Sequence, residues 1–394
     1  MIDGKKYDLQ LFCVTLLLVA LGLIMVTSAT QVIAQERLKA PFYYLQGQAI
    51  RVALGLCFLI IFMKIPFGLF QRFSTVILFV SLLLLAATFV WGREIRGASR
   101  SLSIFNFMLQ PVEIAKLALM IFLASKIAEW KRRIKHFKRG FLPLVAVVML
   151  MAVLVALQPN ISNACLIVLV SFSVLFIGGC RLIHMVPVAS CMLAATAPFV
   201  YRFAHVHGRI EAYLNRGTDL KGLNWQVEQS LIALGSGFLF GCGPGRGHQK
   251  YSFLPDAHTD FIYSIIGEEL GAIGTISVLV LFAFILMRAV RAARRSPNAF
   301  GYLLAVGIGI SIFLTAVINM AMTLGIIPTA GLPLPFISYG GSSLVTSLAA
   351  VGILLNISSQ GSKRACVSER VAHSRPGRKV YARRSRRPSR PTRH

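Results

Sequence analysis

Long apolar stretches alternate with short polar ones along almost the whole chain. A helix of about 20 apolar residues is long enough to cross a bilayer. The pattern predicts about ten such helices, at residues 10–33, 45–63, 72–91, 108–127, 142–158, 161–179, 183–202, 261–287, 302–325 and 332–357. We therefore expect an all-α polytopic membrane protein.

Basic residues in the predicted loops indicate how these helices are oriented. The lysines and arginines gather in every second loop, above all at residues 126–139 and 288–295, while the intervening loops are mixed in charge or nearly uncharged. Loops rich in lysine and arginine stay in the cytoplasm. Both termini should then be cytoplasmic, which requires an even number of spans.

Two predicted outer loops are too long to be simple turns, residues 91–109 and about 203–260. The second lies between spans 7 and 8 and has room for a site outside the bilayer. Amphipathic segments in it, such as residues 209–214, could lie on the membrane. Residues 1–358 would form the transmembrane domain. Residues 359–394 contain twelve lysines and arginines but one acid, which predicts a disordered cytoplasmic tail near anionic lipid.

Composition and charge narrow the function further. The chain has 394 residues, is 56% hydrophobic and carries a formal net charge of +27. In a soluble protein this charge would indicate nucleic-acid binding, but here it lies in cytoplasmic loops and the tail, so no nucleic-acid partner is expected. The short cytoplasmic loops leave no room for an ATPase domain. The seven cysteines lack metal-ligand spacing, so neither a metal site nor a disulfide framework is predicted.

The polar residues 254–262 (LPDAHTDFI) place Asp260 at the mouth of an apolar helix. His258, Lys250 and Arg246 crowd the same end of the long outer loop. Asp260 could simply cap the helix that follows. A carboxylate held there could instead act as a general base toward a sugar hydroxyl group.

A second set of candidates begins the fourth predicted span. Glu113 and Lys116 are three residues apart, so they could form an ordinary ion pair on one helix face. A lysine held inside the membrane near its outer surface could instead bind a diphosphate. Arg100, just upstream, would add to that positive field.

Two adjacent acids, Glu268 and Glu269, lie about two turns into the apolar stretch that follows Asp260. Acids within spans face protein or water and are candidates for function. The alternative is a buried pair with Lys116 or Arg288.

Two further segments are rich in helix-breaking residues. The glycine-rich residues 235–247 lack the Gly-Lys-Ser/Thr ending of a nucleotide-binding loop, but their N–H groups and Arg246 could approach a lipid pyrophosphate. The proline-rich residues 328–343, which include Ser338 and Ser342, break regular helix at the start of a span. Such backbone is tolerated where it lines a cavity or is covered by protein.

Four strings in order resemble one family: QSLIALGSG at residues 229–237, LPDAHTDFI at 254–262, IGEELG at 266–271 and LPFISYGGSS at 334–343. They are similar to the SEDS family of membrane glycosyltransferases, whose branches serve division, elongation and sporulation. The resemblance covers the chain from the first span to about residue 359. The residues of IGEELG and QSLIA are more similar to the division branch than to the elongation branch.

The resemblance implies polymerisation of lipid II at the outer face of the cytoplasmic membrane. Asp260 would deprotonate the acceptor sugar, and undecaprenyl pyrophosphate would leave with inversion. Lys116, Arg100 and a divalent cation, Mg²⁺ or Mn²⁺, would offset the charge of the leaving group. The implied partners are a class B penicillin-binding transpeptidase and other division proteins at the septum. The further candidate substrate-binding residues are Glu113, His258, Lys250, Arg246, Glu268, Glu269, Ser338 and Ser342.

The chain departs from the family pattern at two places. Ser101 follows Arg100 where a tryptophan is usual, and Asn160 replaces the aspartate of a Gln-Pro-Asp-x-Gly-Thr motif. Two alternatives therefore stay open beside the polymerase. A lipid II flippase needs the same cavity but no general base, and a non-catalytic scaffold would only recruit the transpeptidase.

Overall fold

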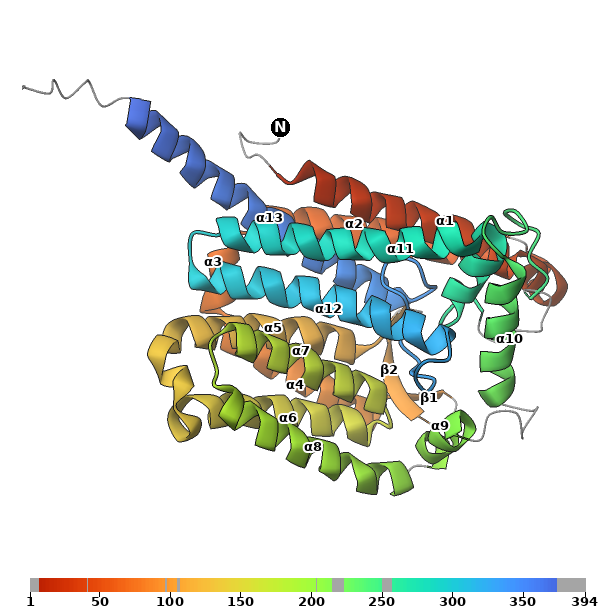
Figure 1. Cartoon of the computed structure of the whole chain (residues 1–394), viewed down its shortest axis with the longest axis horizontal. Coiled ribbons are helices and arrows are strands. Elements are labelled where there is room, and N and C mark those ends of the chain that lie inside the picture. Colours follow the sequence, from red (N-terminus) through yellow and green to blue (C-terminus); the bar gives the residue numbers. More distant parts are fainter. Residues whose placement is uncertain are drawn as a thin grey trace, which may run out of the picture.

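The computed structural model describes residues 7–40, 42–95, 98–104, 107–202, 204–214, 223–249 and 257–373. Most of these residues are helical (Figure 1). The helices are α1 (Leu9–Leu38), α2 (Tyr43–Lys64), α3 (Phe67–Arg72), α4 (Ser74–Trp91), α5 (Pro111–Trp130), α6 (Leu142–Leu157), α7 (Ile161–Ile177), α8 (Leu182–Arg202), α9 (Ala204–Leu214), α10 (Leu223–Ser236), α11 (Ile262–Arg295), α12 (Ala299–Thr323) and α13 (Gly341–His373).

The expected polytopic helical architecture is confirmed. Seven helical segments among the described residues are long and apolar enough to cross a membrane, and two shorter apolar helices lie at Ile161–Ile177 and Leu182–Met192. Helix α5 coincides with the fourth predicted span and carries charged residues at both ends. All ten predicted spans thus coincide with helices, while the number that fully cross the bilayer stays a prediction.

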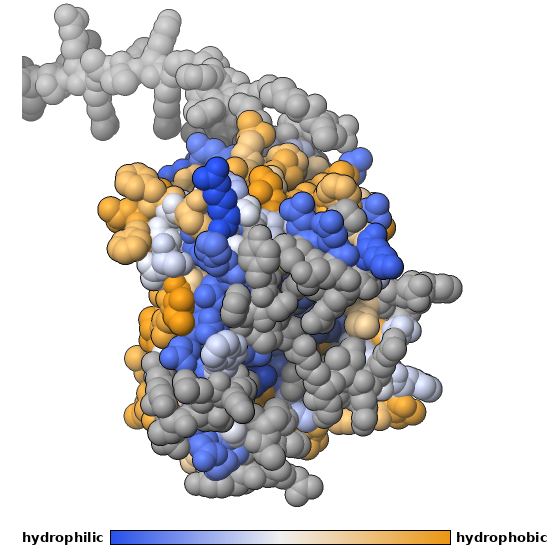
Figure 2. Space-filling view, turned by 90° about the vertical axis from the view of Figure 1, so that its right-hand side faces the viewer, coloured by the Kyte–Doolittle hydropathy of each residue, from blue (hydrophilic) through white to orange (hydrophobic). Residues whose placement is uncertain are grey.

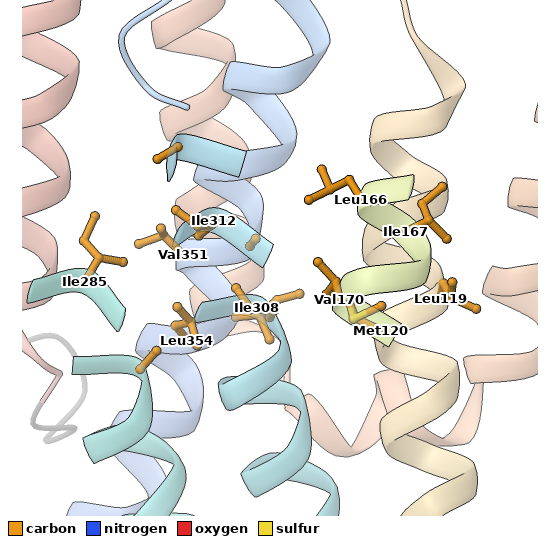
Figure 3. Close-up of a cluster of buried hydrophobic side chains, with 14 of the residues drawn as sticks. Leu119, Met120, Leu166, Ile167, Val170, Ile285, Ile308, Ile312, Val351 and Leu354 are labelled. Carbon is orange, nitrogen blue, oxygen red and sulfur yellow. The ribbon is translucent and has the colours of Figure 1, made fainter. Parts of the chain in front are cut away.

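The long helices pack side by side into one bundle (Figure 1). Helices α12 and α13 are mostly buried, whereas α2 and α4 expose most of their apolar side chains. Side chains from α5, α7, α11, α12 and α13 meet in the core, among them Ile308 and Leu354 (Figure 3). In a membrane this close packing supplies van der Waals contact between helices, while the exposed apolar surface faces lipid.

The two ends of the bundle differ in structure. The basic segment between α5 and α6, a 3₁₀ turn at Lys131–Lys135 and a π-helical turn at Phe137–Phe141, lies at one end. Helices α9 and α10 and the strands β1 (Arg93–Ile95), β2 (Ala98–Ile104) and β3 (Phe107–Leu109) lie at the other (Figure 1). The strands form an antiparallel sheet in the order β1-β2-β3. The first long outer loop is therefore a small sheet, which the helical pattern did not predict.

Both ends of α13 differ from the sequence prediction. Helix α13 begins at Gly341 rather than residue 332, because the three prolines and the glycines before it favour irregular backbone. It continues to His373, so residues 359–373 of the predicted disordered tail are helical. The rest of that tail, residues 374–394, lies outside the described residues.

Candidate functional site

Asp260 lies at the outer end of the bundle, immediately before α11. The N-cap position of α11 is Phe261, whose side chain makes no capping hydrogen bond. Asp260 therefore lies one residue before the cap position. Its backbone carbonyl accepts a hydrogen bond from Nδ2 of Asn319 in α12 at 2.8 Å, and the same amide group donates to the carbonyl of Leu332 at 2.7 Å. A buried side chain thus fixes where Asp260 stands.

Arg209 on α9 is the charged neighbour of Asp260. Its Nη1 donates to the carbonyl of Thr329 at 3.2 Å. A Cβ atom added at Gly331 would lie 3.7 Å from the guanidinium nitrogens of Arg209 and 3.8 Å from Oδ2 of Asp260, so both side chains approach the same glycine. Burial lowers the pKa of Arg209, and the negative charge of Asp260 opposes that shift. The pair joins two parts of the outer loop that are far apart in the sequence.

The proline-rich residues 328–343 support the loop that carries Asp260. Oγ of Ser338 donates to the carbonyl of Thr259 at 2.5 Å. The N–H of Tyr339 donates to the carbonyl of His258 at 2.9 Å, and the two rings lie 5.5 Å apart between centroids. Ser338 and His258, both predicted to bind substrate, are therefore part of the framework that holds Asp260.

Lys116 is the centre of a buried polar network on α5. Its Nζ atom lies 2.8 Å from Oε1 of Glu113, so the predicted ion pair is present. Nζ also donates to Oδ1 of Asn163 at 3.2 Å, and Nδ2 of Asn163 donates to Oδ1 of Asn160 at 3.1 Å. Asn160, which departs from the family motif, is thereby a partner in this network.

A polar cavity of about 50 Å³ adjoins this network. Its lining includes hydroxyl groups from α12 and α13 beside Lys116 and Glu113. Pro335 and Ser343 also line it, and they belong to the proline-rich segment that supports the Asp260 loop. One irregular segment thus reaches both predicted sites. The polar and charged lining residues are Glu113, Lys116, Ser311, Thr315, Ser343, Thr346 and Ser347.

The outer sheet is attached to the same region. Oγ of Ser342, at the start of α13, donates to the carbonyl of Met108 at 3.0 Å and accepts from the N–H of Gln110 at 2.7 Å. Ser342 therefore holds the sheet against the bundle. Arg100 lies on β2, with its backbone described and its side chain outside the described part of the chain. Lys250 lies outside the described residues altogether.

Glu268 and Glu269 accept hydrogen bonds from backbone N–H groups of the glycine-rich loop. Glu268 accepts from the N–H groups of His248 and Gln249, the second at 3.2 Å. Glu269 accepts from the N–H of Gly245 at 3.0 Å and from Oγ of Ser28 at 2.5 Å. Both carboxylates are buried. We call this arrangement of Glu268 and Glu269 with residues 243–249 the loop clasp.

The loop clasp corrects the alternative of a pair with Lys116 or Arg288. Lys116 pairs with Glu113, and Arg288 is 9% exposed and pairs with Asp8. Arg246, inside the clasped loop, is exposed. An acidic residue in an apolar helix can pair with a cationic side chain or accept hydrogen bonds from backbone N–H groups. The spacing of residues in the sequence does not distinguish these two possibilities.

A kink in α11 lets the loop approach these acids. Gly271 has a φ of 69° inside the helix, a conformation that favours glycine. A Cβ atom there would lie 2.4 Å from the backbone nitrogen of Gly241. The N–H of Ala272, which the kink releases, donates to the carbonyl of Phe238 at 2.8 Å.

We expect Glu268→Gln to loosen the loop clasp. The amide loses the charge that strengthens hydrogen bonds to the N–H groups of His248 and Gln249, at a cost of about 2 kcal/mol of stability. Limited proteolysis within residues 235–249 should become faster and the Tm should fall. The control is Glu228→Gln, an exposed acid on α10; equal proteolysis of the two variants would contradict the clasp.

Comparison with known proteins places these features in a family. Residues 8–363 match the FtsW/RodA/SpoVE family, described as a cell cycle protein. The probable peptidoglycan glycosyltransferase FtsW of Trichlorobacter lovleyi is 41% identical over 355 residues, covering 90% of this chain and 93% of that protein. Stage V sporulation protein E of Bacillus subtilis is 36% identical over 353 residues, covering 89% of this chain and 96% of that protein.

Solved structures support the same assignment. One chain of a peptidoglycan synthase complex, described as coordinating polymerization and crosslinking, matches with a TM-score of 0.74 at 27% identity, covering 90% of this chain and 98% of that chain. The rod shape determining protein RodA of Thermus thermophilus matches with a TM-score of 0.66 at 26% identity, covering 90% and 98%. This chain belongs to the FtsW/RodA/SpoVE family, and its similarity to division proteins named FtsW confirms the expected branch.

Proposed function

We propose that this chain is a peptidoglycan glycosyltransferase that polymerises lipid II, with Asp260 as its general base. The observation that carries the proposal is the position of Asp260. Its carboxylate is half-buried at the outer end of the bundle, beside the cation of Arg209, in a chain whose relatives are named peptidoglycan glycosyltransferases. Hydrophilic residues gather on this end of the molecule (Figure 2).

The proposed step transfers one glycan to another in a single displacement. Asp260 takes the proton of the 4-hydroxyl group of the acceptor sugar. The freed oxygen attacks the anomeric carbon of the donor, and the bond between that carbon and the pyrophosphate oxygen breaks. Undecaprenyl pyrophosphate leaves with the electron pair, so the configuration inverts. General base catalysis of this kind contributes about 10²–10⁴ in rate.

Positive charges fit the leaving group. Lys116 borders the polar cavity, and its ammonium group would interact with developing negative charge on the diphosphate.

A groove of about 330 Å³ adjoins Arg209 and is lined mostly by apolar residues of α7, α12 and residues 327–330. A polyprenyl chain could enter this groove below a diphosphate at the outer surface.

A divalent cation stays part of the proposal. The described residues contain no cluster of three His, Cys, Asp or Glu side chains that would enclose a metal ion. Mg²⁺ commonly binds through one or two carboxylates together with substrate phosphates, so the pyrophosphate oxygens of the substrate would supply part of its ligand set. A cation held in this way would neutralise charge on the pyrophosphate.

Arg209 should position and tune Asp260, and its removal tests this. Without the positive charge the carboxylate takes up a proton more readily, so Arg209→Gln should move the acidic limb of the pH–rate profile of kcat/KM to higher pH. The control is Arg202→Gln, at the end of α8. An unchanged limb in Arg209→Gln, with a lower rate at every pH, would mean that Arg209 acts only on the shape of the loop.

The same relatives support a proposed partner and a proposed location. The solved complex that this chain resembles joins polymerization with crosslinking, which supports a class B penicillin-binding transpeptidase as partner. The division relatives support action at the septum. These assignments need co-purification of the transpeptidase and imaging of the tagged chain.

The departures that favour a scaffold have a structural explanation. Asn160 retains a hydrogen bond to Asn163, which in turn accepts from Lys116. Ser101 is buried in β2. The two amides therefore keep the lysine oriented without the usual carboxylate, which supports a working enzyme. A flippase would retain function in Asp260→Asn, whereas the proposed polymerase would lose it.

A further inference from the structure

A second polar pocket lies at the opposite end of the bundle from Asp260. It has a volume of about 240 Å³ and lies between the first residues of α1, the last turns of α11 and Ser358 of α13. This is the end that the basic loops assign to the cytoplasm (Figure 1). Its lining includes Asp8, Gln10, Arg288, Arg291, Arg295 and Ser358.

One side of this pocket is built from a buried ion pair. Nε of Arg288 donates to Oδ2 of Asp8 at 2.9 Å, and Nη1 of Arg288 donates to Oε1 of Gln10 at 2.6 Å. The side chains of Arg288 and Asp8 are 9% and 7% exposed. The N–H of Asp8 donates to Oγ of Ser358 at 3.3 Å. Arg288 therefore neutralises the charge of Asp8, and these hydrogen bonds fix this side of the pocket.

The other arginines of the pocket are Arg291 and Arg295 of α11. Arg291 and Arg295 are exposed. Within the described part of the chain, neither has an acidic partner. They lie three and seven residues after Arg288, so the three side chains follow one face of α11. Two positive charges thus line the pocket with no acidic partner among the side chains that the structure describes.

The surroundings favour a lipid over a soluble anion. Leu9, which lines the pocket, is 69% exposed, and Met287 on α11 is 46% exposed. Apolar side chains exposed beside arginines at a helix end are typical of the boundary between hydrocarbon and headgroups. The pocket is smaller than the roughly 300–1,000 Å³ of sites that enclose a drug-sized molecule, and it suits a headgroup phosphate.

We infer that this pocket binds the phosphate of an anionic phospholipid from the cytoplasmic leaflet. Arg291 and Arg295 contact the phosphate oxygens, Arg288 fixes the wall through Asp8, and Leu9 borders the acyl chains. Basic pockets between transmembrane helices on this side of a membrane bind such headgroups. Because the pocket joins α1, α11 and α13, a bound lipid would hold these three helices together.

The test is a lipid titration of the purified full-length chain, followed by thermal unfolding and native mass spectrometry. Phosphatidylglycerol should raise the Tm and stay bound, while phosphatidylcholine should not. Arg291→Gln and Arg295→Gln should each weaken binding about fivefold. Arg294→Gln is the matched control, because Arg294 is exposed on the same turn but does not line the pocket; its affinity should stay within about twofold of wild type.

Four results would overturn the inference. The first is equal stabilisation of the wild type by phosphatidylglycerol and phosphatidylcholine, which requires no variant to fold. The second is unchanged affinity in Arg291→Gln and Arg295→Gln. The third is an equal loss in Arg294→Gln, which would indicate general surface charge. The fourth is equal stabilisation by inorganic phosphate, which would assign the pocket to a soluble anion.

Discussion

Asp260→Asn should reduce the initial rate of glycan polymerisation by about a thousandfold, within the range that a general base contributes. The amide cannot accept the proton of the attacking hydroxyl group. Folding should be retained, because the loop is held through the backbone carbonyls of Asp260 and Thr259 by Asn319 and Ser338. The measurement is the initial rate with labelled lipid II, together with the Tm of the variant.

The matched control is Glu211→Gln, which makes the same carboxylate-to-amide change on α9. Glu211 is exposed and lies 3.6 Å from His207, one helical turn away. Its variant should polymerise at close to the wild-type rate. A fall of less than tenfold in Asp260→Asn, with Glu211→Gln unaffected, would remove Asp260 from the proton transfer.

Lys116→Gln should lower both stability and activity, for separate reasons. Glu113, 6% exposed, would lose its ion-pair partner, and an uncompensated buried charge costs about 3–5 kcal/mol. Loss of the cation beside the cavity should slow polymerisation by about a hundredfold, as for other groups that stabilise developing charge. Thermal unfolding and the rate measure the two effects independently.

The double variant Glu113→Gln/Lys116→Gln separates these effects. Two neutral amides can hydrogen-bond to each other, so the Tm should recover toward the wild-type value. Activity should stay low, because the positive charge is still absent. Recovery of both quantities would show that Lys116 serves only as the partner of Glu113, and would contradict its proposed contact with the diphosphate.

Much of the fold was predictable from the sequence because it rests on length and composition. Apolar stretches long enough to cross a bilayer leave few alternatives to helix, since lipid offers backbone groups no hydrogen-bond partners. The ten predicted spans accordingly coincide with helices. The sheet of β1–β3 was not predictable in the same way, because β1 and β3 have three residues each and are too short to show a period of two.

The candidate site was predictable in part. Asp260 and the pair of Glu113 and Lys116 stood out because charged residues beside or within apolar stretches are rare. Arg209 was missed as a partner of Asp260. The two residues belong to separate segments of the outer loop, too far apart in the sequence for a helical or strand periodicity to relate them. The only signal was one arginine on an amphipathic helix.

The loop clasp shows a second limit. A carboxylate can accept hydrogen bonds from backbone N–H groups as well as from cationic side chains. The residue types of Glu268 and Glu269 therefore did not indicate which kind of partner they contact. The answer depended on Gly271, whose φ of 69° bends α11 toward the glycine-rich loop. A glycine in an apolar helix is common, so its residue type alone does not predict a kink.

The most direct test of the central claim is polymer formation from labelled lipid II by the purified chain. The chain should be isolated together with its transpeptidase, after the crosslinking site of that partner has been blocked, and in the absence of any other glycosyltransferase. Our account predicts long glycan strands and release of undecaprenyl pyrophosphate in equal amount to the bonds formed. An intact complex that binds lipid II but releases no undecaprenyl pyrophosphate would contradict it.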